Sequence, residues 1–153
     1  MFKHRFYELC YEFKNYYRIF TDASKEGNRV AAAVVHRDNT KCVRLPDTAS
    51  IFRAESYALV LAIDVVRCSK EKKIVIFSDS MSSLQSINGF NLEVDSDLVQ
   101  KFLKDYTILA ENGKNNIVLC WIPSHVGHMM WESSVMKKQM QLQSQHSLYL
   151  SLR

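Results

Sequence analysis

The feature that most constrains the fold of this chain is a short, uninterrupted apolar run near its middle. Residues 73–77 read Lys-Ile-Val-Ile-Phe and lie between a charged segment and a serine-rich segment. A strand with one solvated face alternates apolar and polar residues, whereas a continuous apolar run is typical of a strand covered on both faces. The run therefore predicts a strand that is buried on both sides of a sheet.

The segments around this run predict a mixed sheet covered by helices. Ser50 is the expected N-cap of a helix that continues to about Cys68. Strand formers and polar turns before it indicate an antiparallel meander of three strands. In chain order we expect strands at 16–22, 29–37 and 41–45, a helix at 50–68, the strand at 73–77, helices at 81–87 and 96–111, and a strand at 116–122.

Composition narrows the class of protein. The net charge of +4 is compatible with a nucleic-acid partner but too small to indicate one. The four cysteines form no C-x-x-C pair, which argues against a disulfide framework or a zinc site and suggests an intracellular protein. No charge-free apolar run approaches the ~20 residues that cross a membrane. Four glycines are too few for the phosphate loops of an actin-like ATPase.

Two aspartates follow predicted strands. Asp22 ends the first strand, and Asp79 follows the apolar strand. The carboxyl ends of neighbouring strands are where α/β sheets place their sites. Asp and Ser also initiate turns and cap helices, so either aspartate alone is as readily explained by a turn.

Glu55 favours a functional site over the simpler interpretation of these acids as turn residues. At about 100° per residue it lies at the centre of the apolar face of its predicted helix, and Arg53 lies on the opposite side. The same apolar face carries Ile51, Ala58, Leu59, Ala62 and Val66. An inward carboxylate without a partner is costly, and a cation balances it better than the helix dipole alone. Three converging carboxylates are hard oxygen ligands of the kind that Mg²⁺ or Mn²⁺ prefers.

Four short motifs resemble the ribonuclease H type 1 family. They are Thr21-Asp22-Ala23-Ser24, Arg53-Ala54-Glu55-Ser56-Tyr57-Ala58-Leu59, Ser78-Asp79-Ser80 and Trp121-Ile122-Pro123-Ser124-His125-Val126-Gly127. They cover about 110 residues in the family's order and spacing, and the likeness is strongest to the copies linked to reverse transcriptases of non-LTR retrotransposons. Each motif alone is weak, whereas four in order are specific.

The resemblance implies a fold, an activity and a set of site residues. The fold is the ribonuclease H-like α/β fold, a five-stranded mixed sheet flanked by helices. The activity is two-metal cleavage of the RNA strand of RNA–DNA hybrids, with Mg²⁺ or Mn²⁺ as cofactor and a reverse transcriptase domain as a partner in the parent element. Asp22, Glu55 and Asp79 match the catalytic metal ligands. His125 matches a mobile-loop histidine that aids proton transfer or product release; without the family it would be interpreted as a surface residue.

The chain departs from the family after Gly127. Val135 stands where the family has a fourth acidic ligand, and valine cannot bind a metal. Glu132, one helical turn earlier, is a weaker candidate for that role. We therefore expect a leader or linker remnant at 1–15, a ribonuclease H-like domain at 16–135 that is degenerate after 127, and a divergent tail at 136–153. The alternative function is a non-catalytic, nucleic-acid-binding remnant; a transposase or integrase core would need a late glutamate and lacks the Trp-Ile-Pro-Ser-His-Val-Gly run.

Three further features have open interpretations. Basic residues around 67–73 (Arg67, Lys70, Lys72 and Lys73) form either a solvated turn or a phosphate contact. Trp121 at strand spacing is more typical of a core residue than of a base-stacking platform. Ile51 and Phe52 stand where cellular family members carry asparagines that contact the hybrid, so recognition of the 2′-hydroxyl would depend on backbone groups and on residues such as Asn28.

Overall fold

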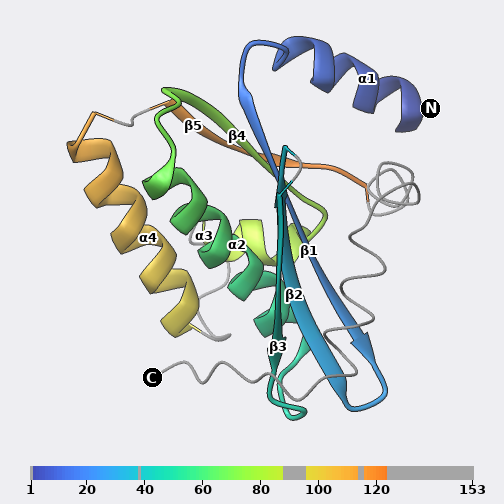
Figure 1. Ribbon diagram of the computed structural model, residues 1–153. Coiled ribbons are helices and arrows are strands. Elements are labelled where there is room, and N and C mark those ends of the chain that lie inside the picture. The colour runs from blue at the N-terminus through green and yellow to red at the C-terminus, as the bar shows by residue number, and fades with distance from the viewer. Residues whose placement is uncertain (1, 38, 88–95, 114–115, 124–153) are drawn as a thin grey trace.

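The apolar run forms β4 (Lys73–Ser78), which lies between two parallel neighbours in a five-stranded sheet. The computed structural model describes residues 2–37, 39–87, 96–113 and 116–123 (Figure 1). The other elements are α1 (Phe2–Glu12), β1 (Tyr17–Glu26), β2 (Arg29–His36), β3 (Asn39–Leu45), α2 (Ile51–Cys68), α3 (Met81–Ile87), α4 (Ser96–Glu111) and β5 (Asn116–Trp121).

The sheet has the strand order β3-β2-β1-β4-β5. β1 pairs antiparallel with β2, and β2 pairs antiparallel with β3, which gives the predicted meander. β1 and β5 both pair parallel with β4. The predicted α/β class, a five-stranded mixed sheet flanked by helices, is confirmed.

β4 is covered on both faces, as its sequence predicts. Residues 74–78 are all buried. Ile74 and Ile76 belong to the larger core, which includes the apolar face of α2. Val75 and Phe77 belong to a second cluster on the other face of the sheet. Alternation along one strand therefore supplies two cores, which is why no polar residue interrupts the run.

α2 begins where the sequence predicts. Ser50 is its N-cap, and the Ser50 Oγ accepts a hydrogen bond from the Arg53 backbone N–H at 3.0 Å. The prediction that Ile51 lies on the buried face is wrong, because its side chain is 41% exposed. The buried residues of α2 begin only at Ala54, so the sheet and α4 cover the helix from its second turn onward.

β1 is longer than the sequence predicts. The predicted strand ends at Asp22, whereas the hairpin with β2 extends the pairing to Glu26 opposite Arg29. Gly27, at a φ of 60°, provides the left-handed turn that closes this hairpin. Asp22 therefore lies within a strand and not at its end.

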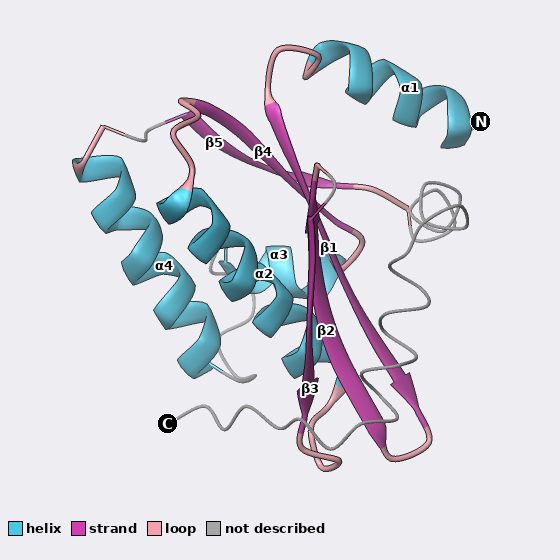
Figure 2. Ribbon diagram, in the orientation of Figure 1, coloured by secondary structure: helices cyan, strands magenta, loops and turns pink. Residues whose placement is uncertain are grey.

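The segment before β1 forms a helix that the sequence did not reveal. α1 lies on the side of the sheet opposite α2 and α4 (Figure 2). Leu9, Cys10 and Phe13 pack against the second core cluster with Val75 and Phe77. The Arg18 guanidinium also donates a hydrogen bond to the Cys10 carbonyl at 2.9 Å. The interpretation of residues 1–15 as a leader remains a prediction, but part of this segment packs on the sheet.

Two further predictions concern the C-terminal tail and membrane-spanning helices. The divergent tail at 136–153, and residues 124–135 before it, lie outside the described residues. Among the described helices, none combines the length and the apolar character that a membrane span requires.

Phe13 tests whether the N-terminal segment stabilises the domain. Its ring lies edge-on to Tyr16 and Phe77, at centroid distances of 5.1 and 6.3 Å. We expect Phe13→Ala to lower the free energy of unfolding by about 2 kcal/mol, less than for a fully buried phenylalanine. Tyr11→Ala is the matched control, because Tyr11 is 71% exposed, and it should change stability by less than about 0.5 kcal/mol. Urea denaturation measures both; equal effects would show that the segment does not contribute to the core.

Candidate active site

The site is located where β1 and β4 separate. Their parallel pairing ends at Phe20 and Phe77, whose rings stack at a centroid distance of 5.1 Å. Asp22 and Asp79 each lie two residues beyond this last pair. Because residues two apart on a strand share a face, Asp22 lies on the face of Phe20. The register of one strand pair thus brings two acids from distant parts of the sequence to the same end of the sheet.

Glu55 reaches this place from the second turn of α2. Its side chain is half-buried and hydrogen-bonded to Ser80, the residue after Asp79. The carboxyl group of Asp79 in turn raises the pKa of Glu55. Glu55 therefore lies beside the segment that follows β4, and the predicted inward orientation of this residue fits its position.

The electrostatics show that the three carboxyl groups are neighbours. The pKa of Asp22 is raised to about 8, first by burial and then by the negative charges of Asp79 and Glu55, while a backbone hydrogen bond from Ala23 opposes the shift. Burial is the main cause that raises the pKa of Glu55, and the hydrogen bond from Ser80 opposes it. At neutral pH the cluster thus retains protons that exposed carboxylates would release.

The negative charge of Asp22 also affects Cys42, which lies on β3 at the edge of the sheet. Cys42 is paired with Ala33, and Ala33 is paired with Asp22, so the three residues lie in one row across the sheet. Burial and the charge of Asp22 raise the pKa of the Cys42 thiol to about 11. Burial and the negative charge of Asp22 thus favour the protonated form of the Cys42 thiol.

The donor set suits a hard divalent cation. All three groups are carboxylates, and each stabilises a cation and destabilises the negative charge of the others. Within the described ranges, no group of three Asp, Glu, His or Cys side chains lies close enough together to share one metal ion. The structure therefore brings Asp22, Glu55 and Asp79 into electrostatic contact, and their common ligation of a metal remains a prediction. His125, Glu132 and Val135 lie outside the described residues.

Three successive backbone carbonyls hold the end of β4 in place. The Phe77 carbonyl accepts from Thr21 Oγ1 at 3.0 Å, and the Ser78 carbonyl accepts from the Ile122 backbone N–H at 2.9 Å. The Asp79 carbonyl accepts from the indole Nε1 of Trp121 at 3.2 Å. Donors from both neighbouring strands thus fix the backbone that carries Asp79.

A buried serine network supports the same segment, and sequence reasoning did not find it. Ser80 Oγ donates to Ser83 Oγ at 2.8 Å, and Ser83 Oγ lies 3.3 Å from Ser56 Oγ on α2. The Ser80 backbone N–H also donates to Ser78 Oγ at 3.1 Å. These four side chains are at most 5% exposed. The serine-rich turn after β4 is visible in the sequence and could have indicated such a network. Only the fold shows that Ser56 of α2 completes it.

Two other sequence interpretations need revision. Trp121 is not a core residue, because it is 39% exposed and its indole N–H binds the Asp79 carbonyl. Arg67 forms ion pairs with Asp64 at 3.0 Å and with Asp105 at 3.2 Å, so it supports the packing of α2 on α4. Lys70 remains without an ion-pair partner among the described residues, which keeps a ligand contact open for it.

Comparison with known proteins gives a consistent result. The RNase H family matches residues 14–139. Among solved structures, LC11-RNase H1 in complex with an RNA/DNA hybrid is 21% identical with a TM-score of 0.56, covering 71% of this chain and 86% of that one. RNase H1 from the halophilic archaeon Halobacterium salinarum NRC-1 is 20% identical with a TM-score of 0.53, covering 70% and 85%. LC11-RNase H1 isolated from compost is 24% identical with a TM-score of 0.57, covering 72% and 86%.

These matches differ in what they establish. No curated protein sequence matches the chain significantly. At 20–24% identity the structural likeness shows the fold alone. The family match covers most of the chain, including all four motifs. Proteins of this family generally use divalent metal ions, in agreement with the carboxylate donors at the end of β4. This protein belongs to the ribonuclease H family.

Proposed function

We propose that this protein is an endoribonuclease that cleaves the RNA strand of RNA–DNA hybrids with two divalent metal ions. The observation that carries the proposal is the placement of three carboxyl groups at one end of the sheet, where Asp22 and Asp79 lie two residues beyond the last β1–β4 pair and Glu55 contacts Ser80 beside them. Such crowding is unfavourable unless a cation or a proton offsets it. A solved neighbour of the same fold, LC11-RNase H1, binds an RNA/DNA hybrid, which supports the substrate class.

The residues of this chain have distinct roles in the proposed reaction. Asp22, Glu55 and Asp79 would hold Mg²⁺ or Mn²⁺, and such ions activate a water and stabilise the leaving oxygen of a phosphodiester. Ser80 is proposed to help position the Glu55 carboxyl group, because the two side chains are in hydrogen-bond contact. Trp121 and Thr21 fix the backbone on either side of Ser78 and so position Asp79. His125 is proposed to aid proton transfer or product release.

The origin and the cellular context are also proposals. The motifs favour descent from a non-LTR retrotransposon, in which a reverse transcriptase domain would be the partner. The scattered cysteines, none of which forms a disulfide, favour an intracellular location. Val135 in place of a fourth acid favours reduced activity, and the alternative is a domain that binds nucleic acid without cleaving it.

A cleavage assay separates the two functions. A hybrid with a labelled RNA strand is incubated with the protein and either Mg²⁺ or Mn²⁺, and binding of the same hybrid is measured in parallel. Metal-dependent cleavage that disappears in Asp79→Asn supports the enzyme. Hybrid binding that is unchanged in Asp79→Asn, with no cleavage under either metal, would establish the non-catalytic alternative.

The raised pKa of Asp22 predicts how stability depends on pH without metal. Asp22 titrates at about 8 in the folded protein and near 4 when unfolded, so the folded state holds an extra proton between these values. The contribution of Asp22 to stability is therefore greatest at low pH and falls as pH rises, by about 1 kcal/mol per unit between about pH 5 and 8. The raised pKa of Glu55 acts in the same direction. Thermal unfolding in EDTA should show this fall.

Two variants and the addition of Mn²⁺ test this predicted pH dependence. Asp22→Asn should flatten the pH dependence and raise the Tm at pH 8, whereas Glu26→Gln, an exposed acid on the same strand, should leave the pH dependence unchanged. Mn²⁺ should raise the Tm of the wild type at pH 8 by binding the folded state. Most of that gain should be lost in Asp22→Asn. An equal response of both proteins to Mn²⁺ would show that the ion binds elsewhere.

Val135→Asp tests whether the missing fourth acid is what reduces activity. The substitution restores an acid at the family's spacing, so hybrid cleavage should rise at least about tenfold above a low or absent wild-type level. Adding Asp79→Asn should abolish the gain, because both acids would serve one metal cluster. Val135→Asn is the control for size and polarity. A folded Val135→Asp protein as inactive as the wild type would show that the divergence after Gly127 is structural and more than one lost ligand.

A further inference from the structure

Ser83 is a fully buried residue between the two segments that carry Glu55 and Asp79. It lies in α3, and its Oγ accepts a hydrogen bond from Ser80 Oγ at 2.8 Å. The same Oγ lies 3.3 Å from Ser56 Oγ on α2, within hydrogen-bond distance. Ser56 directly follows Glu55 in the sequence, and Ser80 directly follows Asp79. One hydroxyl group therefore links the two acid-bearing segments.

These contacts form a closed ring that passes through Glu55. The Glu55 side chain is hydrogen-bonded to Ser80, and Ser80 is hydrogen-bonded to Ser83. Ser83 contacts Ser56, which a peptide bond joins to Glu55. All three serines are at most 5% exposed, so water competes little for these hydrogen bonds. The ring restricts the carboxyl group more than a single contact does, because the group cannot move without α2 or the turn after β4 moving as well.

Ser83 differs in this respect from the other buried serine of α3. Ser86 is 4% exposed, and its Oγ donates to the Ser82 carbonyl of the same helix at 3.0 Å. A bond to the carbonyl four residues earlier is a common arrangement for a serine hydroxyl within a helix. The Ser83 hydroxyl instead bonds to side chains outside its own helix. Its contacts therefore join separate elements.

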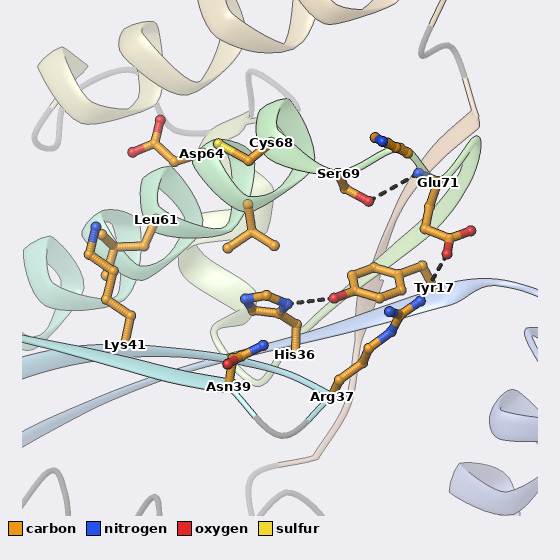
Figure 3. A pocket seen from close by; sticks show the side chains of 12 residues that line it. Tyr17, His36, Arg37, Asn39, Lys41, Leu61, Asp64, Cys68, Ser69 and Glu71 are labelled. Atoms are coloured by element: carbon orange, nitrogen blue, oxygen red, sulfur yellow. Dashed lines mark hydrogen bonds and ion pairs between the residues drawn. The ribbon is translucent and has the colours of Figure 1, made fainter.

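α2 has independent anchors, so its place on the sheet does not depend on Ser83. At the far end of α2, Ser69 Oγ accepts from the Glu71 backbone N–H at 3.1 Å, and Glu71 pairs with Arg37 at 2.9 Å (Figure 3). Along the helix, the apolar residues of α2 pack into the larger core. Loss of the Ser83 hydroxyl should therefore leave the helix in place and affect mainly the carboxyl group of Glu55.

A hydroxyl group is suited to this link because it can act in both directions. Ser80 has a single hydroxyl proton and two neighbours that can accept it, Ser83 Oγ and the Glu55 carboxyl group. Since a hydroxyl both donates and accepts, Ser83 can bind Ser80 whichever way that proton points. Ser83→Ala would remove this partner from both Ser80 and Ser56.

Divalent ions of different size make different demands on such a carboxyl group. Mg²⁺ requires near-ideal octahedral geometry at about 2.0–2.1 Å, whereas Ca²⁺ accepts about six to eight oxygens in flexible arrangements at about 2.3–2.6 Å. Supporting hydrogen bonds orient a ligand before the ion arrives, which benefits most the ion with the stricter geometry. A carboxyl group held by a closed ring therefore favours the smaller ion.

We propose that Ser83 is a positioning residue for Glu55, and that its contacts to Ser80 and Ser56 raise the affinity of the site for Mg²⁺ relative to Ca²⁺. This role rests on the proposed function, because it requires that the three acids bind a cation. It extends the site to a residue outside the four sequence motifs.

Ion affinities of the full chain test this role without any measurement of cleavage. Mn²⁺ binding is followed by the EPR signal of the free ion, and Mg²⁺ and Ca²⁺ affinities are measured by competition with Mn²⁺. Ser83→Ala should weaken Mg²⁺ binding by about threefold to tenfold, as expected for one lost buried hydrogen bond, and Ca²⁺ binding by less than about twofold. Ser56→Ala should have the same effect. The double variant should bind Mg²⁺ about as well as either single variant, because both changes break one ring.

Ser86→Ala is the matched control, because it removes a buried hydroxyl from the same helix that takes no part in the ring. It should leave both ion affinities unchanged while it lowers the Tm in EDTA by a small amount similar to that of Ser83→Ala. Equal losses of Mg²⁺ and Ca²⁺ affinity in Ser83→Ala would indicate a general loss of structure. Unchanged affinities in a folded Ser83→Ala protein would show that the hydroxyl positions nothing. Either result would overturn the proposal.

Asp79→Asn distinguishes a failure of this proposal from a failure of the proposed function. Mn²⁺ binding that is as tight in Asp79→Asn as in the wild type would show that the ion binds elsewhere, which would overturn both the cation site and the role of Ser83. Mn²⁺ binding that is lost in Asp79→Asn, with unchanged ion selectivity in Ser83→Ala, would support the cation site and overturn the role of Ser83 alone.

Discussion

The parallel pairing of β1 with β4 is the constraint on which the candidate active site depends. It sets Phe20 opposite Phe77, and therefore sets Asp22 and Asp79 at the same distance beyond the last pair. It also places Thr21 where its hydroxyl binds the Phe77 carbonyl. A shift of one residue in this register would move Asp22 to the other face of the sheet, away from Asp79. The site is thus a consequence of strand register and not of any local motif.

The fold holds three carboxyl groups in a place that disfavours their charge. Burial and mutual repulsion raise the pKa values of Asp22 and Glu55, so the protein without cation is stabilised by protons. Hydrogen bonds around Asp79 and the serine network between α2 and α3 resist this repulsion. Rigid support beneath repelling ligands is what a cation site requires, because the ion then meets groups that are already oriented.

Most of the fold could be predicted from the sequence, because periodicity and caps are local. The apolar run of β4 and the Ser50 cap of α2 were both found this way. The sequence also predicts that Asp22, Glu55 and Asp79 form one site, from two aspartates after strands and a glutamate on an apolar helix face; the fold brings them into electrostatic contact, and their common metal binding stays a prediction. The helix α1 was missed because its core contacts, made by Leu9 and Cys10, are with a cluster that includes Val75 and Phe77, far along the chain. The role of Trp121 was misjudged because its partner is a backbone carbonyl, which no side-chain pattern reveals.

The central claim is that the carboxylates of Asp22, Glu55 and Asp79 form one cation site. Crystals grown with Mn²⁺ and measured near the manganese absorption edge test it most directly, because anomalous scattering locates the ion without reference to any assumed site. The account predicts a strong anomalous peak within about 2–2.5 Å of oxygens from all three residues, and no such peak in Asp22→Asn. Manganese bound only at other acids, with the three carboxylates apart, would contradict it.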